Sequence, residues 1–299
     1  MGYALAFGVV ILIFITTFTL VLGRLLTRRL PPDPADTPQN HGLPGEPVRF
    51  PSRYKVQLQG WWVPAPQARG TVIFCHGRWG SLEGDLPLAV PLHRAGYNVL
   101  LFNLRAHGNS EGDTVTFGVF EKEDLLGAVD FLVQEKGVQQ VSLLGLSMGA
   151  GVALITAALT DKVNALVLDG VYLRFVDTIE AWLRQRWVPP ILSDWLAVLI
   201  ILGASVRTNT RMYQVSPRLW AKHLSAEVPV LFIHAEKDEF VRLNDVRLLA
   251  SDLKGPHEIW VAPGSAHRRA FADHPQLYME KVIGWLERQQ ALTPAEPPG

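Results

Sequence analysis

The sequence contains very little cysteine: Cys75 is the only one in a chain of 299 residues. A single cysteine excludes an intramolecular disulfide and agrees with a reducing compartment. Because Cys75 stands in an apolar run, we interpret it as a small core residue and not as a nucleophile. No histidine, cysteine and carboxylate residues have the spacing of metal ligands, so we predict neither a metal nor another cofactor.

The chain also lacks an excess charge of either sign. Lys and Arg number 28, and Asp and Glu also number 28, so the formal net charge is zero. Such a balance does not predict a nucleic-acid partner. Charge is missing altogether from residues 3–23. As a helix rising about 1.5 Å per residue, this segment would cover roughly the 30 Å hydrocarbon core of a bilayer.

Three interpretations of this apolar segment compete. A signal peptide has a basic start, a shorter apolar core and a small-x-small cleavage site, none of which is present. A buried core helix is disfavoured by the length. We therefore predict a single-pass transmembrane anchor, which forms residues 1–30 together with its basic flank of Arg24, Arg28 and Arg29. Since nothing basic precedes the segment, the positive-inside rule predicts a cytoplasmic location for the rest of the protein.

The rest of the chain is predicted to form one domain over residues 48–290. Residues 31–47 are rich in Pro, Asp, Asn and Gly and are typical of a linker, and the Pro-rich residues 291–299 are predicted to be a disordered tail. Within the domain, strands are expected at 48–54, 55–63, 71–75, 97–102, 141–144, 163–168, 228–233 and 258–261. Helices are expected at 86–95, 119–135, 245–253 and 276–289. This alternation predicts an α/β fold with a mostly parallel sheet flanked by helices, and a site beyond the carboxyl ends of the strands.

One strand leads directly into the pattern G-x-S-x-G, from Gly145 through Ser147 to Gly149. The small apolar residues that follow predict a helix, so the motif has the strand–turn–helix context of a catalytic serine. A turn this sharp strains the serine backbone, and glycines two residues before and after it avoid a collision. The alternative is a chance match in a Gly/Ser loop. A dinucleotide-binding loop is excluded because the glycines do not have its spacing.

A catalytic serine needs a histidine base and an orienting carboxylate. His267 lies in the loop after the last predicted strand, where it can reach toward Ser147. Asp238 follows the strand at 228–233, and Asp169 is the second candidate for the acid. Ser147, Asp238 and His267 occur in the hydrolase order of serine, acid and histidine. The histidines at other strand ends are interpreted as loop-shaping or structural residues: His76, His107 and His234.

Acyl transfer also requires two N–H donors for the oxyanion. The backbone N–H of Met148, directly after the serine, is the first candidate. The second is the backbone N–H of Arg78, in the turn after the strand at 71–75. Because the donor is backbone, we interpret the side chain of Arg78 as a surface charge.

From about residue 48 to 288 the chain resembles the α/β-hydrolases, near the monoacylglycerol-lipase and serine-aminopeptidase-like branch and its membrane-anchored members. The matching residues are His76-Gly77, the run 105–112, the run 145–149, Asp238 and His267. The resemblance implies the roles of nucleophile, acid and base for Ser147, Asp238 and His267. The chain departs from the family at loop positions, with Asn103 where Asp is common and with Ala106 and Ala235 where Gly is common.

The segment at about 170–227 falls where this fold inserts a helical cap. It contains Trp182, Trp187 and the apolar run 195–203, which is too short to span a bilayer. Two interpretations stay open: a helix that packs over the sheet, or an apolar lid over an acyl-chain pocket that touches the membrane surface.

These observations predict a serine hydrolase that cleaves carboxylic esters or thioesters, with an acyl-enzyme on Ser147. The expected partners are a small-molecule ester or lipid substrate and, through the N-terminal helix, the membrane. A serine peptidase of the aminopeptidase or prolyl-oligopeptidase type is an alternative, but the sequence shows no charged groups that would hold a peptide terminus. A non-catalytic binding protein with the hydrolase fold is a third possibility.

Overall fold

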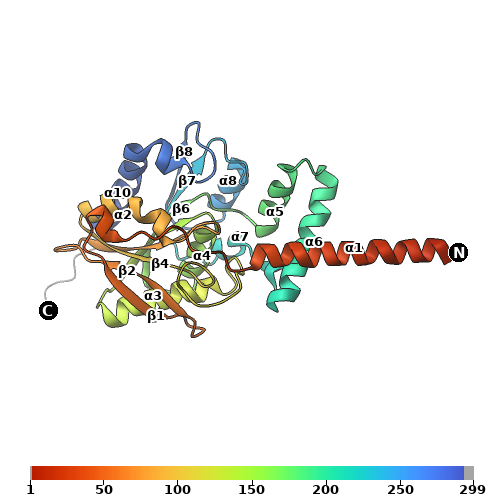
Figure 1. Ribbon diagram of the computed structural model, residues 1–299. Coiled ribbons are helices and arrows are strands. Elements are labelled where there is room, and N and C mark those ends of the chain that lie inside the picture. Colours follow the sequence, from red (N-terminus) through yellow and green to blue (C-terminus); the bar gives the residue numbers. More distant parts are fainter. Residues whose placement is uncertain (1, 293–299) are drawn as a thin grey trace.

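An eight-stranded sheet forms the centre of the computed structural model, which describes residues 2–292 (Figure 1). The strand order is β1-β2-β4-β3-β5-β6-β7-β8. The first two strands, β1 (Glu46–Pro51) and β2 (Gln57–Val63), pair antiparallel, and β2 pairs antiparallel with β4. The others run parallel: β3 (Gly70–Cys75), β4 (Tyr97–Phe102), β5 (Val141–Leu146), β6 (Val163–Asp169), β7 (Val230–Ala235) and β8 (His257–Ala262).

Helices cover both faces of the sheet, and each face has its own apolar core. One core includes residues of α2 (Leu82–Arg94) and α10 (Pro275–Leu292). The other includes residues of α3 (Glu121–Glu135), α4 (Met148–Ala157) and α8 (Leu243–Ser251). The central strands β3, β5 and β7 are almost wholly buried, as expected for parallel strands covered on both sides. The predicted fold class is therefore confirmed.

Several element boundaries differ from the predicted ones. Strand β5 extends to Leu146, so it runs directly into the serine turn. Helix α2 begins at Leu82, four residues earlier than expected, and it contains two prolines. Residues 31–47 include a short 3-10 helix, η1 (Pro38–His41), and they pack on the domain through Leu43, which is buried. Helix α10 extends to Leu292, so most of the predicted disordered tail, 293–299, lies outside the described residues.

The cap between β6 and β7 consists of α5 (Phe175–Arg184), α6 (Pro190–Thr208), the 3-10 helix η2 (Met212–Gln214) and α7 (Pro217–Ala221). The apolar run 195–203 is the middle of the 19-residue helix α6. The run alone is too short to span a bilayer, but the whole helix is longer than the run. By length and composition both α6 and residues 5–27 could cross a membrane, but 39% of the apolar window of α6 is buried and only 6% of the N-terminal one.

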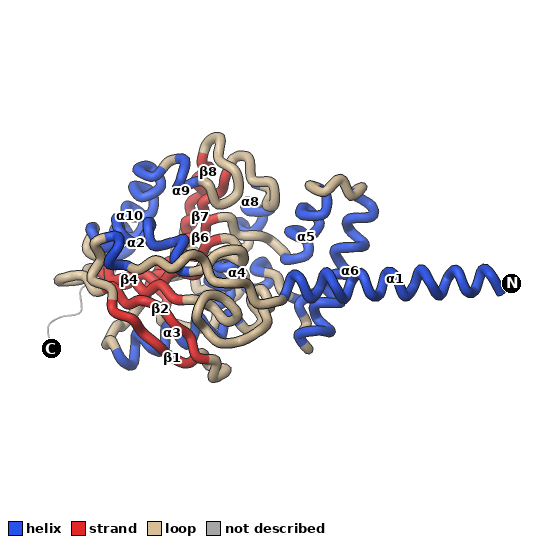
Figure 2. The backbone as a smooth tube through the Cα atoms, in the orientation of Figure 1, coloured by secondary structure: helices blue, strands red, loops and turns tan. Residues whose placement is uncertain are grey.

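The N-terminal helix α1 (Gly2–Thr27) projects from the body of the protein, and its last turns cross α6 (Figures 1 and 2). The two backbones approach closely at glycine. A Cβ atom on Gly23 would lie 2.6 Å from the backbone nitrogen of Ala204, and one on Gly203 would lie 2.7 Å from the carbonyl oxygen of Thr19. Small residues at such a crossing let two helices pack backbone to backbone. Helix α1 is thereby fixed to the cap.

Candidate active site

Ser147 occupies the sharp turn between β5 and α4, and its backbone is strained. Its φ of 54° and ψ of −113° lie where residues with a side chain are rarely found. The flanking glycines are required sterically, as predicted. A Cβ atom on Gly145 would lie 2.5 Å from the carbonyl oxygen of Gly149, and one on Gly149 would overlap the carbonyl oxygen of Cys75. The turn therefore presents the Ser147 hydroxyl at the carboxyl edge of the sheet.

The structure brings the three predicted triad residues together. His267, in the loop after β8, has its Nε2 2.8 Å from Ser147 Oγ and its Nδ1 2.7 Å from Asp238 Oδ2. The other carboxylate oxygen of Asp238 accepts the backbone N–H groups of Phe240 and Val241, at 2.9 and 2.8 Å. These bonds fix the carboxylate, which in turn orients the imidazole. With Nδ1–H donating to Asp238, Nε2 is free to accept the proton of the serine hydroxyl.

The second candidate for the acid, Asp169, has a different environment. It ends β6 beside Ser147, whose backbone N–H donates to the carbonyl oxygen of Asp169 at 2.7 Å. Its carboxylate accepts the hydroxyl of Tyr278 at 3.1 Å, and burial raises its pKa. Asp238, not Asp169, is therefore the carboxylate hydrogen-bonded to His267. Sequence reasoning did not identify Gly170, where a Cβ atom would lie 2.9 Å from His267 Cε1 and crowd the imidazole.

The loop after β3 lies against the serine, as the oxyanion-hole prediction requires. A Cβ atom on Gly77 would lie 3.5 Å from Ser147 Cβ, and Arg78 and Met148 line the same cavity as Ser147. Neither the Arg78 nor the Met148 backbone N–H has an acceptor within residues 2–292. Both N–H groups are therefore available to a developing oxyanion.

The side chain of Arg78 is not the surface charge that the sequence suggested, since it is 4% exposed. Its guanidinium donates to the carbonyl oxygen of Leu26 at 3.0 Å and to that of Arg28 at 2.7 Å. Leu26 lies in the last turn of α1, where carbonyl acceptors have no partner within the helix, and Arg28 directly follows the helix. Burial lowers the pKa of Arg78 to about 10, which still leaves the side chain charged at neutral pH. Arg78 thus links the candidate oxyanion loop to the N-terminal helix.

Two histidines shape the loops around the site, as expected. His76 donates from Nδ1 to the carbonyl oxygen of Gly77 at 2.8 Å, and its Nε2 accepts the backbone N–H of Leu104 at 3.0 Å. Complete burial lowers the pKa of His76 well below its usual value, so it is neutral. His107 donates from Nδ1 to the carbonyl oxygen of Arg105, and burial and the charge of Arg78 lower its pKa.

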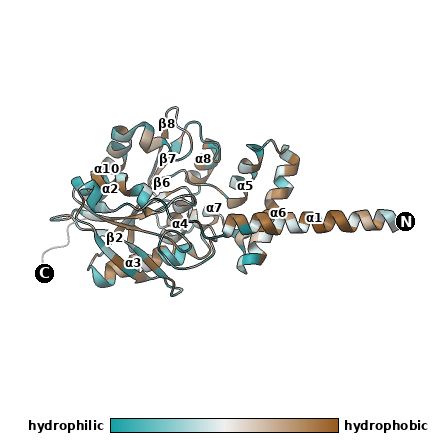
Figure 3. Ribbon diagram, in the orientation of Figure 1, coloured by the Kyte–Doolittle hydropathy of each residue, from teal (hydrophilic) through white to brown (hydrophobic). Residues whose placement is uncertain are grey.

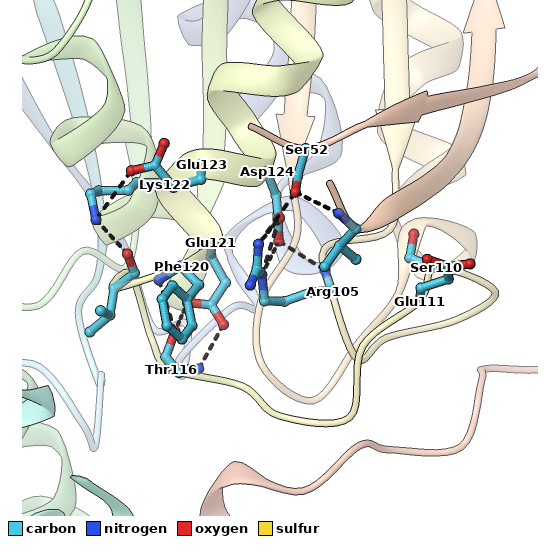
Figure 4. Close-up of polar contacts among 12 residues, drawn as sticks. Ser52, Arg105, Ser110, Glu111, Thr116, Phe120, Glu121, Lys122, Glu123 and Asp124 are labelled. Atoms are coloured by element: carbon cyan, nitrogen blue, oxygen red, sulfur yellow. Dashed lines mark hydrogen bonds and ion pairs between the residues drawn. The ribbon is translucent and has the colours of Figure 1, made fainter. Parts of the chain in front are cut away.

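The run 105–112 stabilises the scaffold. Arg105 points toward Asp124 and Ser52 (Figure 4), and its guanidinium forms a buried ion pair with the Asp124 carboxylate at 2.6 Å. Burial raises the pKa of Asp124 to about 6 despite this partner. Ala106 has a φ of 57°, a left-handed conformation that explains why the resembled family often has glycine there. Arg105 is therefore a structural residue and is not directed at a substrate.

An apolar cavity of about 430 Å³ opens beside Ser147 and His267. Ser147 and His267 form its polar end. The apolar lining comes from the cap, from α1 and from loops: Leu22, Leu25, Leu26, Trp79, Phe117, Met148, Tyr172, Phe175, Ile179, Trp182, Ile200 and Phe240. The lining contains no carboxylate among the described residues. The volume lies in the range of roughly 300–1,000 Å³ that suits a small organic ligand.

Known proteins share both the sequence pattern and the fold. The family model described as alpha/beta hydrolase fold matches residues 70–194. The uncharacterized protein YqkD of Bacillus subtilis is 27% identical over 250 residues, which cover 82% of this chain and 80% of that one. The lysophosphatidylserine lipase ABHD12 of Danio rerio is 27% identical over 210 residues, which cover 65% of this chain and 51% of that one.

Among solved structures, the esterase Pf2001 of Pyrococcus furiosus superposes with a TM-score of 0.74 at 23% identity, over 88% of this chain and 98% of that one. The acylaminoacyl peptidase of Pyrococcus horikoshii superposes with a TM-score of 0.63 at 17% identity, over 86% of this chain and 43% of that one. The chain therefore has the α/β-hydrolase fold, and its sequence is similar to proteins of that family. The closer branch suggested by the motifs stays a prediction.

Proposed function

We propose that the protein is a serine hydrolase that cleaves carboxylic ester or thioester bonds of apolar acyl substrates. The observation that carries this proposal is the hydrogen-bonded chain from Ser147 through His267 to Asp238 at the end of an apolar cavity. His267 removes the proton of the Ser147 hydroxyl as the oxygen attacks the acyl carbon, and then gives it to the leaving alcohol or thiol. Water, activated by His267, hydrolyses the acyl-enzyme.

The oxyanion of each tetrahedral intermediate is stabilised by the backbone N–H groups of Met148 and Arg78. Met148 is also the first residue of α4, so the positive end of the helix dipole faces the same place. Losing one such donor commonly costs roughly 10²–10³ in turnover. Because the strained turn and the loop after β3 fix both donors before substrate arrives, the site requires little rearrangement.

The lining of the cavity favours esters over peptides. A peptidase that holds a free amino terminus needs a carboxylate in the pocket, and the lining residues include none. The charged side chains in the lining are Arg78, which binds carbonyls of α1, and Arg268, which pairs with Asp85 at 2.9 Å. An ester substrate with an apolar acyl group needs no such charged partner.

We also propose that α1 anchors the protein in a membrane, with the hydrolase domain on the cytoplasmic side. Residues 5–18 of this helix are exposed. All of them except Thr16 and Thr17 are apolar or glycine, and the helix is coloured mostly as hydrophobic (Figure 3). A cleaved signal sequence is disfavoured because Arg78 and the cap pack against the end of α1. The cap also supports a location at the membrane, because α6 exposes a stripe of apolar side chains. The stripe is formed by Ile191, Trp195, Val198, Leu202 and Val206. The exposed Arg24 and Arg28 follow the apolar span, which supports the orientation.

The function is tested with full-length protein in detergent and p-nitrophenyl esters of increasing acyl length. We expect hydrolysis by the wild type and a fall in kcat/KM of at least ~10³ in Ser147→Ala. Ser251→Ala is the matched control, since Ser251 is an exposed serine on α8 and should behave as wild type. Activity that survives in Ser147→Ala would contradict the proposal. A preference for aminoacyl amides over esters would favour a peptidase.

A further inference from the structure

The apolar cavity extends from Ser147 to a membrane helix. Three of its lining residues, Leu22, Leu25 and Leu26, belong to the last turns of α1. Helix α1 therefore forms part of the cavity wall besides carrying the apolar span. Another part of the wall comes from the cap, through Ile179 on α5 and Ile200 on α6.

Helix α1 presents different faces to its neighbours. Thr19, Gly23 and Thr27 are buried at a spacing of four residues, and this face packs on α6. At the same crossing, Arg207 on α6 donates a hydrogen bond from Nε to Thr27 Oγ1, at 2.9 Å. Leu22 and Leu26 directly precede Gly23 and Thr27. Because successive residues of a helix point in different directions, the two leucines face the cavity while Gly23 and Thr27 face α6. The orientation of the leucines is thus determined by helix–helix packing.

The residues that directly follow α1 are also held by the rest of the protein. The guanidinium of Arg29 donates to the carbonyl oxygens of Gly108, Ser110 and Gly112, at 2.6, 2.8 and 2.8 Å. Arg78 binds the carbonyl oxygens of Leu26 and Arg28. A wall held in place by these contacts and by the crossing with α6 can define the length and shape of a bound chain.

The mouth of the cavity lies next to α1. Of the large apolar side chains in the lining, Leu25 and Trp79 are the exposed ones, at 42% and 68%. Residues 3–20 of α1 rise by ~26 Å at about 1.5 Å per residue, close to the thickness of a hydrocarbon core. Leu22 and Leu25 therefore fall at the edge of that core, where an acyl chain leaves the bilayer.

We propose that the C-terminal turns of α1 form one wall of an acyl-chain subsite, so that the membrane anchor takes part in substrate selection. The inference rests on the proposed function of Ser147. The ligand is the hydrocarbon chain of a lipid-like ester, which enters beside Leu25 and lies between Leu22 on α1 and Ile200 on α6. Its carbonyl then reaches Ser147.

The test changes the subsite and measures acyl-length selectivity in the full-length chain. Each methylene buried in an apolar subsite is worth up to about fourfold in kcat/KM, so the wild-type profile should rise with chain length until the subsite is filled. Leu22→Trp fills the subsite and should lower kcat/KM for dodecanoyl relative to butanoyl esters by at least about tenfold. Leu22→Ala enlarges it and should move the optimum to longer chains.

The matched control is Val21→Trp, because Val21 is the neighbouring residue on α1, is half exposed and lies outside the cavity lining. It should keep the wild-type ratio of dodecanoyl to butanoyl hydrolysis. Labelling of Ser147 by a short fluorophosphonate reports whether each variant has an assembled site. Leu22 variants that are labelled normally but keep the wild-type ratio would overturn the inference alone. A wild-type protein that neither hydrolyses the esters nor takes the probe would overturn the proposed function with it.

Discussion

At the scale of single residues, the site depends on glycines, which have no side chain, as much as on the serine, the histidine and the aspartate. Ser147 has its strained conformation because Gly145 and Gly149 leave room for the turn. His267 reaches Ser147 because Gly170, with a φ of 68°, has no side chain in its path. A nucleophile, a base and an acid in the right order predict a mechanism, but these glycines make the geometry possible.

The first prediction concerns Gly149. In Gly149→Ala the new methyl group overlaps the carbonyl oxygen of Cys75 in β3. Because the methyl group is attached directly to the backbone of α4 and the oxygen belongs to the backbone of β3, the strand and the helix must move apart. We expect a loss of more than about 2 kcal/mol in the free energy of unfolding and no measurable esterase activity. Gly284→Ala is the control, since the helical Gly284 has only the end of the Arg288 side chain nearby. The measurements are the thermal unfolding and the esterase activity of the two variants. If Gly149→Ala were as stable as Gly284→Ala, the predicted steric overlap would be contradicted.

The second prediction concerns the pH dependence of stability. His76 has a folded-state pKa well below its unfolded value of about 6.5, so the unfolded chain binds more protons below that pH. The stability that comes from burying His76 in its neutral form is present in full above pH 6.5. It is lost as the pH falls below that value, by up to about 1.4 kcal/mol per pH unit. His76→Gln should lose less stability than the wild type between pH 7 and 5.5.

The measurement is denaturant unfolding in detergent at both pH values. His257→Gln serves as the control because His257 is exposed, and it should lose as much stability as the wild type. If His76→Gln loses as much stability as the wild type between the two pH values, burial of a neutral His76 does not cause the pH dependence.

At the scale of helices and strands, the sheet was predictable and the contacts of α1 were not. The apolar runs that gave β3 to β7 are buried on both faces, and a local pattern is enough to identify such strands. The contacts of Arg78 are with carbonyls about 50 residues earlier in the chain, on a helix whose composition indicates only a membrane span. Leu22 and Leu26 show a helical spacing, but no pattern tells which surface they meet. The triad could be predicted because each member follows a recognisable strand.

The third prediction tests the crossing of α1 and α6. In Gly23→Leu the side chain must push against the backbone of Ala204, which would separate the two helices. We expect a lower unfolding temperature and lower kcat/KM for long-chain esters, since the crossing also places the leucines of the cavity. Gly8→Leu is a closely matched control, because Gly8 lies on the same helix and has nothing within 4 Å. If both variants behaved alike, the crossing would have no role in the site.

At the scale of the whole molecule, the apolar helix and the hydrolase domain form one structure. Arg29 and Arg78 each bind carbonyl groups across the boundary between them, and α1 contributes to the cavity wall. An N-terminal anchor is often a dispensable attachment, joined to its domain by a linker. Here the segment expected to be a linker follows the point at which the helix is already packed on the domain.

The fourth prediction follows for truncated proteins. Removing residues 1–29 takes away both carbonyl acceptors of Arg78 and leaves a buried charge unpaired, which costs on the order of 1–3 kcal/mol. The unfolding temperature should fall by several degrees, and long-chain esters should lose more activity than short ones. Removing only residues 2–14, which precede the buried face of α1, should have neither effect in detergent. Equal stability of the two truncated proteins would show that the helix and the domain are independent.

The central claim, that Ser147 is a nucleophile activated by His267 and Asp238, is tested most directly by mass spectrometry after reaction with a fluorophosphonate. Full-length protein in detergent should gain a single adduct, on the peptide that contains Ser147. The adduct should be absent in Ser147→Ala and should form far more slowly in His267→Ala. No adduct on the wild type, or an adduct on another serine with Ser147 unmodified, would contradict the account.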